Sequence, residues 1–231
     1  MKPLSLFLMA CFVLKTSTNV QAQSNPDTMH HNYTYLALGD SYTIGEGVEL
    51  QKNFPYQTVG LLRKAGYAFY APEIIAKTGW TTDELEAAVN EYAFLPKYDF
   101  VSLLIGVNNQ YRGRDIIEYK EQLEHLIKRS IALTGGKPEH VVVLSIPDYS
   151  VTPFGQRMDA EKIAKEIDAY NNLCRALSIQ FKVQYLDITA INRKASGKPT
   201  AVVADGLHPS EKTYGKWAAE LADAVKKTIK K

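Results

Sequence analysis

The fold of this chain is decided by the stretch Tyr35-Leu-Ala-Leu-Gly-Asp-Ser-Tyr-Thr-Ile-Gly-Glu-Gly47. It begins as a short apolar run that stops at Gly39, and Asp40 and Ser41 follow directly. Short apolar runs closed by a turn are typical of buried parallel strands. Ligands of an open parallel sheet bind beyond the carboxyl ends of its strands. The stretch therefore predicts a strand that presents Ser41 to a site.

A second motif near the C-terminus, Asp205-Gly-Leu-His208-Pro209, contains the partners that a reactive serine requires. A serine nucleophile needs a general base, and the base needs a group that orients it. Asp205 and His208 are three residues apart, so a tight turn lets the carboxylate reach the imidazole. The other histidines lie in the polar N-terminal segment, in the middle of a helical pattern or at the amino end of a strand: His30, His31, His125 and His140.

Four sequence blocks, taken in order, resemble those of the SGNH hydrolases, also called GDSL-type esterases and lipases, in their exported bacterial form. The marker residues of that family match Ser41 in Gly-Asp-Ser-Tyr, Gly79 in Lys-Thr-Gly-Trp, Asn108 in Gly-Val-Asn-Asn and His208 in Asp-Gly-Leu-His-Pro. The resemblance covers residues 33 to about 221. It implies a flavodoxin-like three-layer α/β/α sandwich.

Apolar runs and helical patterns alternate along the chain, as expected for βαβ units around a parallel sheet. The expected strands cover residues 33–38, 67–76, 98–105, 141–146 and 183–188. Helix starts are expected near Pro55, at the capping-box pattern of Thr81, and after Asp115 and Ser210. Because crossovers are right-handed, helices should cover both faces of one five-stranded, doubly wound α/β domain.

Two local expectations accompany this pattern. The helix after Pro55 should turn Val59, Leu61 and Leu62 inward, and it should stop at Gly66. Residues 190–203 should return irregularly from the last strand to the site.

The first 22 residues resemble a signal peptide rather than a part of the fold. They contain a basic start, an apolar run up to Leu14 and a small-residue pattern that ends at Ala22. Residues 23–32 then read as a flexible linker to an SGNH hydrolase domain over residues 33–231. We therefore expect export to the periplasm or the medium. As an alternative, Leu8-Met9-Ala10-Cys11 resembles a lipoprotein box that would anchor the chain through Cys11, although the apolar run continues past Cys11.

Charge and motif content indicate no macromolecular partner. Once Lys2 and Lys15 leave with the signal peptide, 25 basic and 25 acidic residues remain, so the formal charge of +2 does not favour nucleic acid. No apolar stretch is long enough to span a membrane. No phosphate-binding glycine motif and no metal-ligand spacing is present, so we expect neither cofactor nor metal. The oligomeric state stays open.

The chemistry expected at these motifs is acyl transfer. Ser41 is the candidate nucleophile, His208 the base that takes its proton, and Asp205 the group that orients the imidazole. The developing oxyanion would be stabilised by the backbone N–H of Ser41. The resemblance implies two further donors, the backbone N–H of Gly79 and the side-chain amide of Asn108.

Residues that flank these donors are the candidates for contacting substrate. Tyr42 stands where the family usually has Leu, and Asn109 stands where Asp often follows the marker asparagine. Trp80, Tyr111 and Arg112 neighbour the two oxyanion donors, so they are expected to line the substrate mouth. For Arg112 the alternative is a solvated loop arginine beside packed aromatic residues.

The sequence thus predicts a serine esterase that acts on a small-molecule, glycan or lipid ester. A carbohydrate O-acetyl ester and a lipid or lysophospholipid ester both stay open as substrates. The alternative from another class is a non-catalytic carbohydrate- or lipid-binding module on the same scaffold. The joint presence of Ser41, Asp205 and His208 argues against it, because a binding module needs none of the three.

Overall fold

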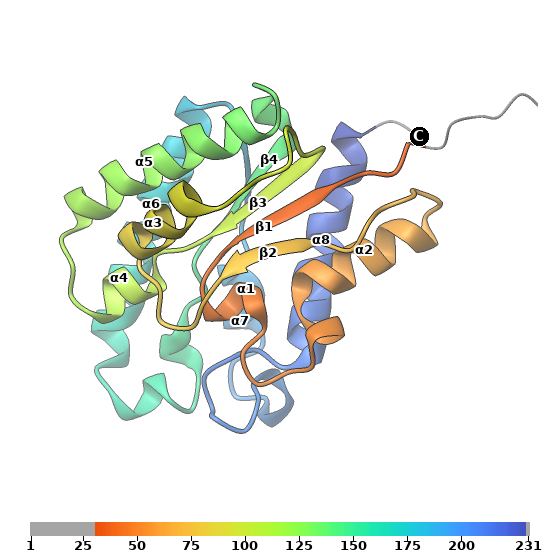
Figure 1. Ribbon diagram of the computed structural model, residues 1–231. Helices are drawn as coiled ribbons and strands as arrows, with labels where there is room; N and C mark the ends of the chain where they lie inside the picture. Colours follow the sequence, from red (N-terminus) through yellow and green to blue (C-terminus); the bar gives the residue numbers. More distant parts are fainter. Residues whose placement is uncertain (1–30, 230–231) are drawn as a thin grey trace, which may run out of the picture. The chain divides into compact units, whose positions relative to one another are not determined.

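Five short apolar runs form one parallel sheet in the computed structural model, which describes residues 31–229 (Figure 1). The strands are β1 (Tyr35–Gly39), β2 (Glu73–Ala76), β3 (Phe100–Leu104), β4 (Val141–Leu144) and β5 (Gln184–Leu186). Their order is β2-β1-β3-β4-β5, and every neighbouring pair is parallel. The expected α/β fold class is confirmed. The signal peptide, the Cys11 alternative and most of the linker fall outside the described residues.

Helices cover both faces of this sheet (Figure 1). On one face lie α2 (Phe54–Lys64) and α8 (Glu211–Thr228), and on the other lie α3 (Thr82–Glu91), α5 (Ile116–Leu133) and α6 (Ala160–Gln180). The connection from β1 to β2 runs along the sheet in the opposite direction to the connections from β2 to β3, β3 to β4 and β4 to β5. Right-handed crossovers therefore place α2 on one face and α3, α5 and α6 on the other. The strand order reverses between β1 and β3, which leaves a crevice at their carboxyl ends where ligands bind in such sheets.

The core is centred on the three middle strands. All residues of β1, β3 and β4 are buried, as expected for strands covered on both faces. Trp217 of α8 is fully buried and contacts the rings of Phe54 in α2, Tyr214 in α8 and Tyr42, which follows Ser41. The α2–α8 layer therefore supports the segment that carries the candidate nucleophile.

The helix starts predicted from the sequence are confirmed. The backbone N–H of Thr81 donates to the Glu84 carboxylate (2.9 Å) in a capping box that opens α3. The side chain of Asp115 accepts from the Ile117 N–H at the start of α5, and that of Ser210 accepts from the Thr213 N–H at the start of α8.

Three local predictions were wrong. The second strand begins only after Pro72, which has no N–H for a ladder, and Phe69 makes an isolated bridge with Tyr33 instead. Leu61 is exposed, because Val59 and Leu62 already define the buried side of α2 and Leu61 points away from it. The segment 190–203 is not irregular, since it contains most of α7 (Thr189–Lys194) and a 3-10 turn (Pro199–Ala201).

Two very short helices were not predicted, and both carry candidate site residues. Ser41 opens α1 (Ser41–Ile44), directly after β1, and Asn108 lies in α4 (Val107–Tyr111), which follows β3. Helices of one turn are too short to show the apolar repeat by which longer helices are predicted.

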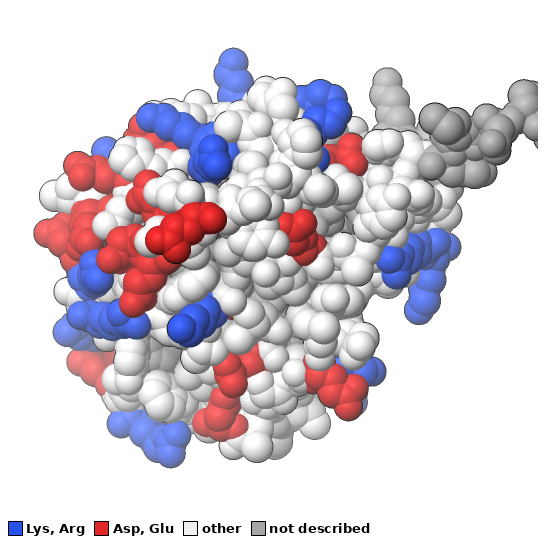
Figure 2. Space-filling view, viewed as in Figure 1, with Lys and Arg blue, Asp and Glu red and all other residues white. Residues whose placement is uncertain are grey.

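The surface carries both signs of charge. Figure 2 shows acidic side chains over α3 and α5, with Lys and Arg side chains among them. No helix between residues 31 and 229 combines the length and the apolar character needed to cross a membrane. That no nucleic acid binds stays a prediction.

We predict that Gly39→Ala destabilises the fold. A Cβ at Gly39 would collide with the Leu104 carbonyl oxygen of β3 and with Thr43 Oγ1. The carbonyl belongs to the sheet and cannot move aside, so we expect a loss of about 1–3 kcal/mol in the free energy of unfolding, measured by urea denaturation.

The matched control is Gly60→Ala in α2, where a Cβ meets nothing within 4 Å. This change should stabilise the protein by roughly 0.5–1 kcal/mol. Equal stabilities of the two variants would contradict the prediction.

Candidate active site

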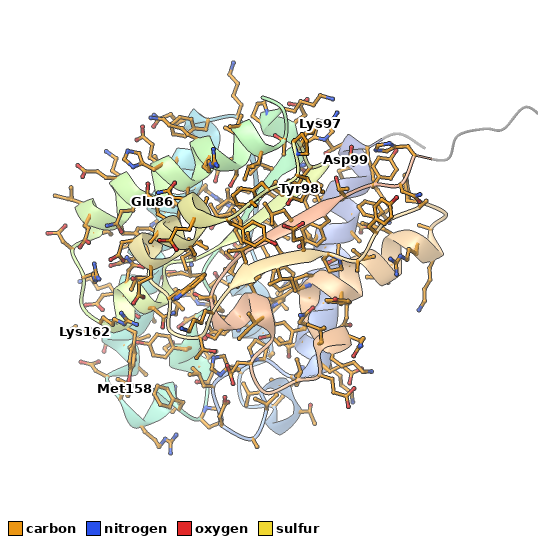
Figure 3. All side chains as sticks on the ribbon, in the orientation of Figure 1. Glu86, Lys97, Tyr98, Asp99, Met158 and Lys162 are labelled. Atoms are coloured by element: carbon orange, nitrogen blue, oxygen red, sulfur yellow. The ribbon has the colours of Figure 1, made fainter. Side chains whose placement is uncertain are left out.

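The structure brings Ser41 and His208 together across 167 residues of sequence. His208 Nε2 lies 2.9 Å from Ser41 Oγ, and His208 Nδ1 lies 2.6 Å from Asp205 Oδ2. His140, by contrast, contacts the Asp99 carbonyl oxygen. Figure 3 labels Asp99 at the amino end of β3, whereas Ser41 follows the carboxyl end of β1. Ser41, His208 and Asp205 therefore have the arrangement of nucleophile, base and orienting carboxylate.

Asp205 fixes both the turn and the imidazole. Its Oδ1 accepts from the backbone N–H groups of Leu207 (2.7 Å) and His208 (3.0 Å), which leaves Oδ2 for the ring. Burial raises the pKa of Asp205, but the hydrogen bonds from the His208 ring and from these two N–H groups outweigh it, so the pKa lies below its usual value. An ionised Asp205 holds a proton on His208 Nδ1. Nε2 is then free to accept the Ser41 proton.

Asp40, directly before the candidate nucleophile, is buried without a countercharge. Its Oδ1 accepts from the Tyr42 N–H (3.0 Å), which caps α1. Its Oδ2, Thr43 Oγ1 and the Tyr214 hydroxyl are buried without a hydrogen-bond partner in the described chain. Burial raises the pKa of Asp40 to about 7, against the smaller opposing effect of the backbone N–H bonds. The carboxyl beneath Ser41 therefore keeps its proton to a higher pH than an exposed aspartate does.

The two oxyanion donors implied by the family resemblance face the same space as Ser41. Gly79 has a φ of +86° in the turn after β2, and Asn108 lies in α4 after β3. Asn108 Nδ2 donates to the Trp80 carbonyl oxygen (2.9 Å), which identifies the nitrogen of this amide. An amide nitrogen carries two hydrogens, so one N–H of Asn108 is left to point at a ligand.

Ser41 and His208 open into a cavity of about 200 Å³. Its wall contains a cluster of Tyr111, Tyr149 and Phe154, whose ring centroids lie 6.2 to 6.4 Å apart. The remaining lining residues are Tyr42, Thr78, Gly79, Val107, Asn108 and Leu207. The sequence analysis missed Tyr149 and Phe154 as site residues. Their position after the fourth strand, at the same sheet edge as Ser41, was the available indication.

The residues predicted to line the substrate mouth divide into two groups. Tyr42 and Tyr111 line the cavity, and Tyr111 is half-exposed at its edge. Asn109 does not, because it is fully buried and exchanges hydrogen bonds with the Thr82 N–H (3.1 Å) and hydroxyl (2.7 Å). This prediction was wrong: an amide that satisfies a helix start in the interior is not available to substrate.

Trp80 and Arg112 also lie outside the cavity wall. Trp80 is partly buried and packs against the hydrophobic core. Arg112 Nη2 donates to the Gly79 carbonyl oxygen (2.6 Å), and Nη1 lies 3.4 Å from the Glu84 carboxylate. The prediction that these side chains line the mouth was wrong, because protein partners engage the Arg112 guanidinium and the core engages the indole.

A larger cavity of about 440 Å³ contains none of the candidate catalytic side chains. Gln156, Asn192, Lys198 and Thr213 are among its lining residues. Within residues 31–229, no group of three or more His, Cys, Asp or Glu side chains is placed to hold a metal ion. The smaller cavity is the candidate active site, because it alone of the two contains the candidate nucleophile, the candidate base and the candidate oxyanion donors.

Three solved structures resemble this fold over most of its length. They are TesA (18% identity, TM-score 0.69), the acetylxylan esterase Axe2 from Geobacillus stearothermophilus (21%, 0.67) and a lipase/acylhydrolase from Enterococcus faecalis (20%, 0.70). The matches cover 85%, 86% and 86% of this chain and 99%, 97% and 97% of those chains. At such identities the likeness shows the fold alone. No curated protein sequence matches the chain.

The fold and the match to a family model define an ester-hydrolysing enzyme. Residues 37–216 match the model of the GDSL-like lipase/acylhydrolase family, a range that includes both Ser41 and His208. The chain belongs to this family, as its resemblance to the SGNH hydrolases led us to expect. It is therefore a hydrolase rather than the non-catalytic binding module considered above.

We predict that Asp40→Asn removes a pH dependence of stability. An acid with a raised pKa binds more protons when folded, so its contribution to stability is greatest below its unfolded pKa of 3.8 and falls as the pH rises towards about 7. As the pH rises over this range, wild type should lose stability relative to Asp40→Asn, because the variant has no carboxyl to ionise. The free energy of unfolding of the variant should therefore increase relative to that of wild type. The expected growth is up to about 1.4 kcal/mol per pKa unit, measured by urea denaturation at pH 4, 5.5 and 8.

Asp205→Asn serves as the control of opposite sign. The pKa of Asp205 is lowered, so its stabilising effect is present above the unfolded pKa and is lost as the pH falls. A wild-type-to-variant difference for Asp40→Asn that is the same at all three pH values would contradict the assignment of a raised pKa.

Proposed function

We propose that the protein cleaves carboxylic esters through an acyl-Ser41 intermediate. The observation that carries this proposal is the 2.9 Å distance between His208 Nε2 and Ser41 Oγ, with Asp205 on the other ring nitrogen. Ser41 Oγ attacks the ester carbonyl while His208 takes its proton. His208 then gives that proton to the departing alcohol, and water activated by the same nitrogen releases the acid.

The developing negative charge would be bound by donors from three strand ends. Ser41 is the first residue of α1, so its backbone N–H has no partner within that helix. The Gly79 N–H and the second N–H of Asn108 complete the set. Such donors act most strongly when they are positioned before the reaction, because no reorganisation is then required.

The cavity favours a short acyl group. Its volume of about 200 Å³ lies below the roughly 300 Å³ at which sites for drug-sized ligands begin. The aromatic cluster of Tyr111, Tyr149 and Phe154 offers a wall on which the apolar face of a sugar ring can pack. We propose a carbohydrate O-acetyl ester as the substrate, in agreement with the name of the acetylxylan esterase of similar fold. A lipid or lysophospholipid ester is the alternative.

We also propose that the protein is exported. The support is the sequence pattern of residues 1–22, which lie outside the described residues. The N-terminal sequence of the mature protein should begin at Gln23. An N-terminus at a lipidated Cys11 would instead establish the lipoprotein alternative.

We predict that Ser41→Ala abolishes the hydrolysis of p-nitrophenyl acetate, with a fall in kcat of up to about 10⁶-fold. A fluorophosphonate should add its phosphonyl group to the wild-type protein and not to this variant, because the activated serine oxygen bonds to phosphorus and displaces fluoride. Ser130→Ala in α5, where the hydroxyl donates only to the Leu126 carbonyl, is the matched control and should keep full activity. Covalent labelling of the Ser41→Ala protein would refute the proposed nucleophile.

We predict a steep preference for short acyl chains. Over a p-nitrophenyl ester series from acetate to palmitate, kcat/KM should be highest at acetate and should fall as the acyl chain lengthens, since a cavity of about 200 Å³ cannot enclose a long chain. Release of acetate from an acetylated xylo-oligosaccharide tests the sugar ester directly. A maximum at octanoate or longer would favour the lipid alternative and would leave the role of Ser41 untouched.

A further inference from the structure

We propose that Arg112 is a positioning residue for the oxyanion hole, which holds the turn of Gly79 against α4 so that the donors of two separate loops converge. The inference rests on the proposed function, because that function assigns the Gly79 N–H and the Asn108 amide as donors. It gives the guanidinium a role that differs from contacting the substrate at the mouth of the cavity.

The turn that contains Gly79 depends on a conformation that only glycine adopts easily. The Trp80 N–H donates to the Lys77 carbonyl oxygen (3.2 Å) and closes the turn, with Gly79 at a φ of +86° as its third residue. The absence of a side chain also leaves Gly79 free to rotate, so the direction of its N–H is not set by the residue itself.

Arg112 removes this freedom. The peptide group between Gly79 and Trp80 is planar, and its two polar ends are both held. The N–H end donates to Lys77, and the carbonyl end accepts from Arg112 Nη2 at 2.6 Å. With this plane fixed, the rotation of Gly79 that would swing its own N–H away from the cavity costs a charge-assisted hydrogen bond.

Side chains of α4 also bind the residues that follow Gly79. Asn108 Nδ2 donates to the carbonyl oxygen of Trp80 (2.9 Å), one residue after the one that Arg112 holds. Asn109 exchanges two hydrogen bonds with Thr82 at the start of α3. Two side chains of α4 and that of Arg112, which caps its C-terminus, thus bind parts of the segment that presents the Gly79 N–H.

These side-chain bonds are needed because the sheet does not connect the two loops. β2 and β3 each pair with β1 and not with one another. The turn after β2 and the helix after β3 therefore meet only above the carboxyl end of β1, where Ser41 lies. Their relative position, and with it the spacing of the two oxyanion donors, is set by the contacts of Asn108, Asn109 and Arg112.

The guanidinium is itself held in place. Its Nη1 lies 3.4 Å from the Glu84 carboxylate, which also accepts from the Thr81 N–H in the α3 capping box. The planar guanidinium can donate to the Gly79 carbonyl and to the Glu84 carboxylate at the same time. The single ammonium group of a lysine is less well suited to this geometry. The Arg112 side chain is 43% exposed, so its removal leaves no buried charge unpaired and should spare the fold.

The test compares Arg112→Gln and Arg112→Lys with Arg114→Gln in the purified full chain. Arg114 is the matched control, because it joins Asp83 and Glu118 and makes no side-chain bond to the Gly79 turn. We expect Arg112→Gln to lower kcat for p-nitrophenyl acetate by about 10- to 100-fold, since a small misplacement of a catalytic group has effects of this size. KM should stay within about twofold, Arg112→Lys should be intermediate, and Arg114→Gln should match wild type.

A second readout separates donor placement from general damage. The rate of covalent inactivation by a fluorophosphonate, whose adduct places an oxygen in the oxyanion hole, should fall in parallel with kcat, while the melting temperature of Arg112→Gln stays close to that of Arg114→Gln. Equal losses of kcat in Arg112→Gln and Arg114→Gln would overturn the inference. A rise in KM confined to anionic esters, with kcat unchanged, would also overturn it.

Asn108→Ala and Ser41→Ala distinguish this inference from the proposed function. If Asn108→Ala loses about 10²- to 10³-fold in kcat while Arg112→Gln loses nothing, the positioning role is wrong and the esterase mechanism stands. If both Asn108→Ala and Ser41→Ala keep full activity, the proposed function is wrong and this inference fails with it.

Discussion

The structure depends on the parallel pairing of β1 between β2 and β3. This pairing brings the carboxyl ends of three strands to one edge of the sheet, and each end continues into a segment with a candidate catalytic part. Ser41 follows β1, Gly79 follows β2 and Asn108 follows β3. The strand order reverses between β1 and β3, which leaves a crevice at this edge, and the turn of His208 reaches Ser41 there from the far end of the sequence.

The same edge holds the least well-satisfied polar groups of the described interior. Asp40, Thr43 and Tyr214 each keep a buried oxygen atom without a protein partner beneath Ser41. Burying a carboxyl without a countercharge lowers stability at neutral pH, and the raised pKa of Asp40 reflects that cost. The cap that Asp40 provides to α1 offsets part of it by fixing the turn on which Ser41 is presented.

Sequence reasoning located the strands, the longer helices and the marker residues, because apolar period, capping residues and motif order are local properties of the chain. It failed where a role depends on a partner distant in sequence. Asn109 and Arg112 flank an oxyanion donor in the sequence, yet their side chains turn to Thr82 and Gly79 instead of the cavity. Tyr149 and Phe154 were missed as site residues, because their place in the cavity wall follows from how the segment after β4 packs beside Tyr111.

By itself, the sequence determined the α/β class, the family and the identity of the candidate nucleophile, base and orienting carboxylate. These follow from residue types at fixed local spacing, such as the separation of three positions between Asp205 and His208. Only the tertiary structure decided the volume of the cavity, which aromatic rings form its wall and which side chains bind the turn that carries the candidate donor Gly79. These are distances between loops that no strand pairing connects, so they depend on how side chains pack rather than on any pattern along the chain.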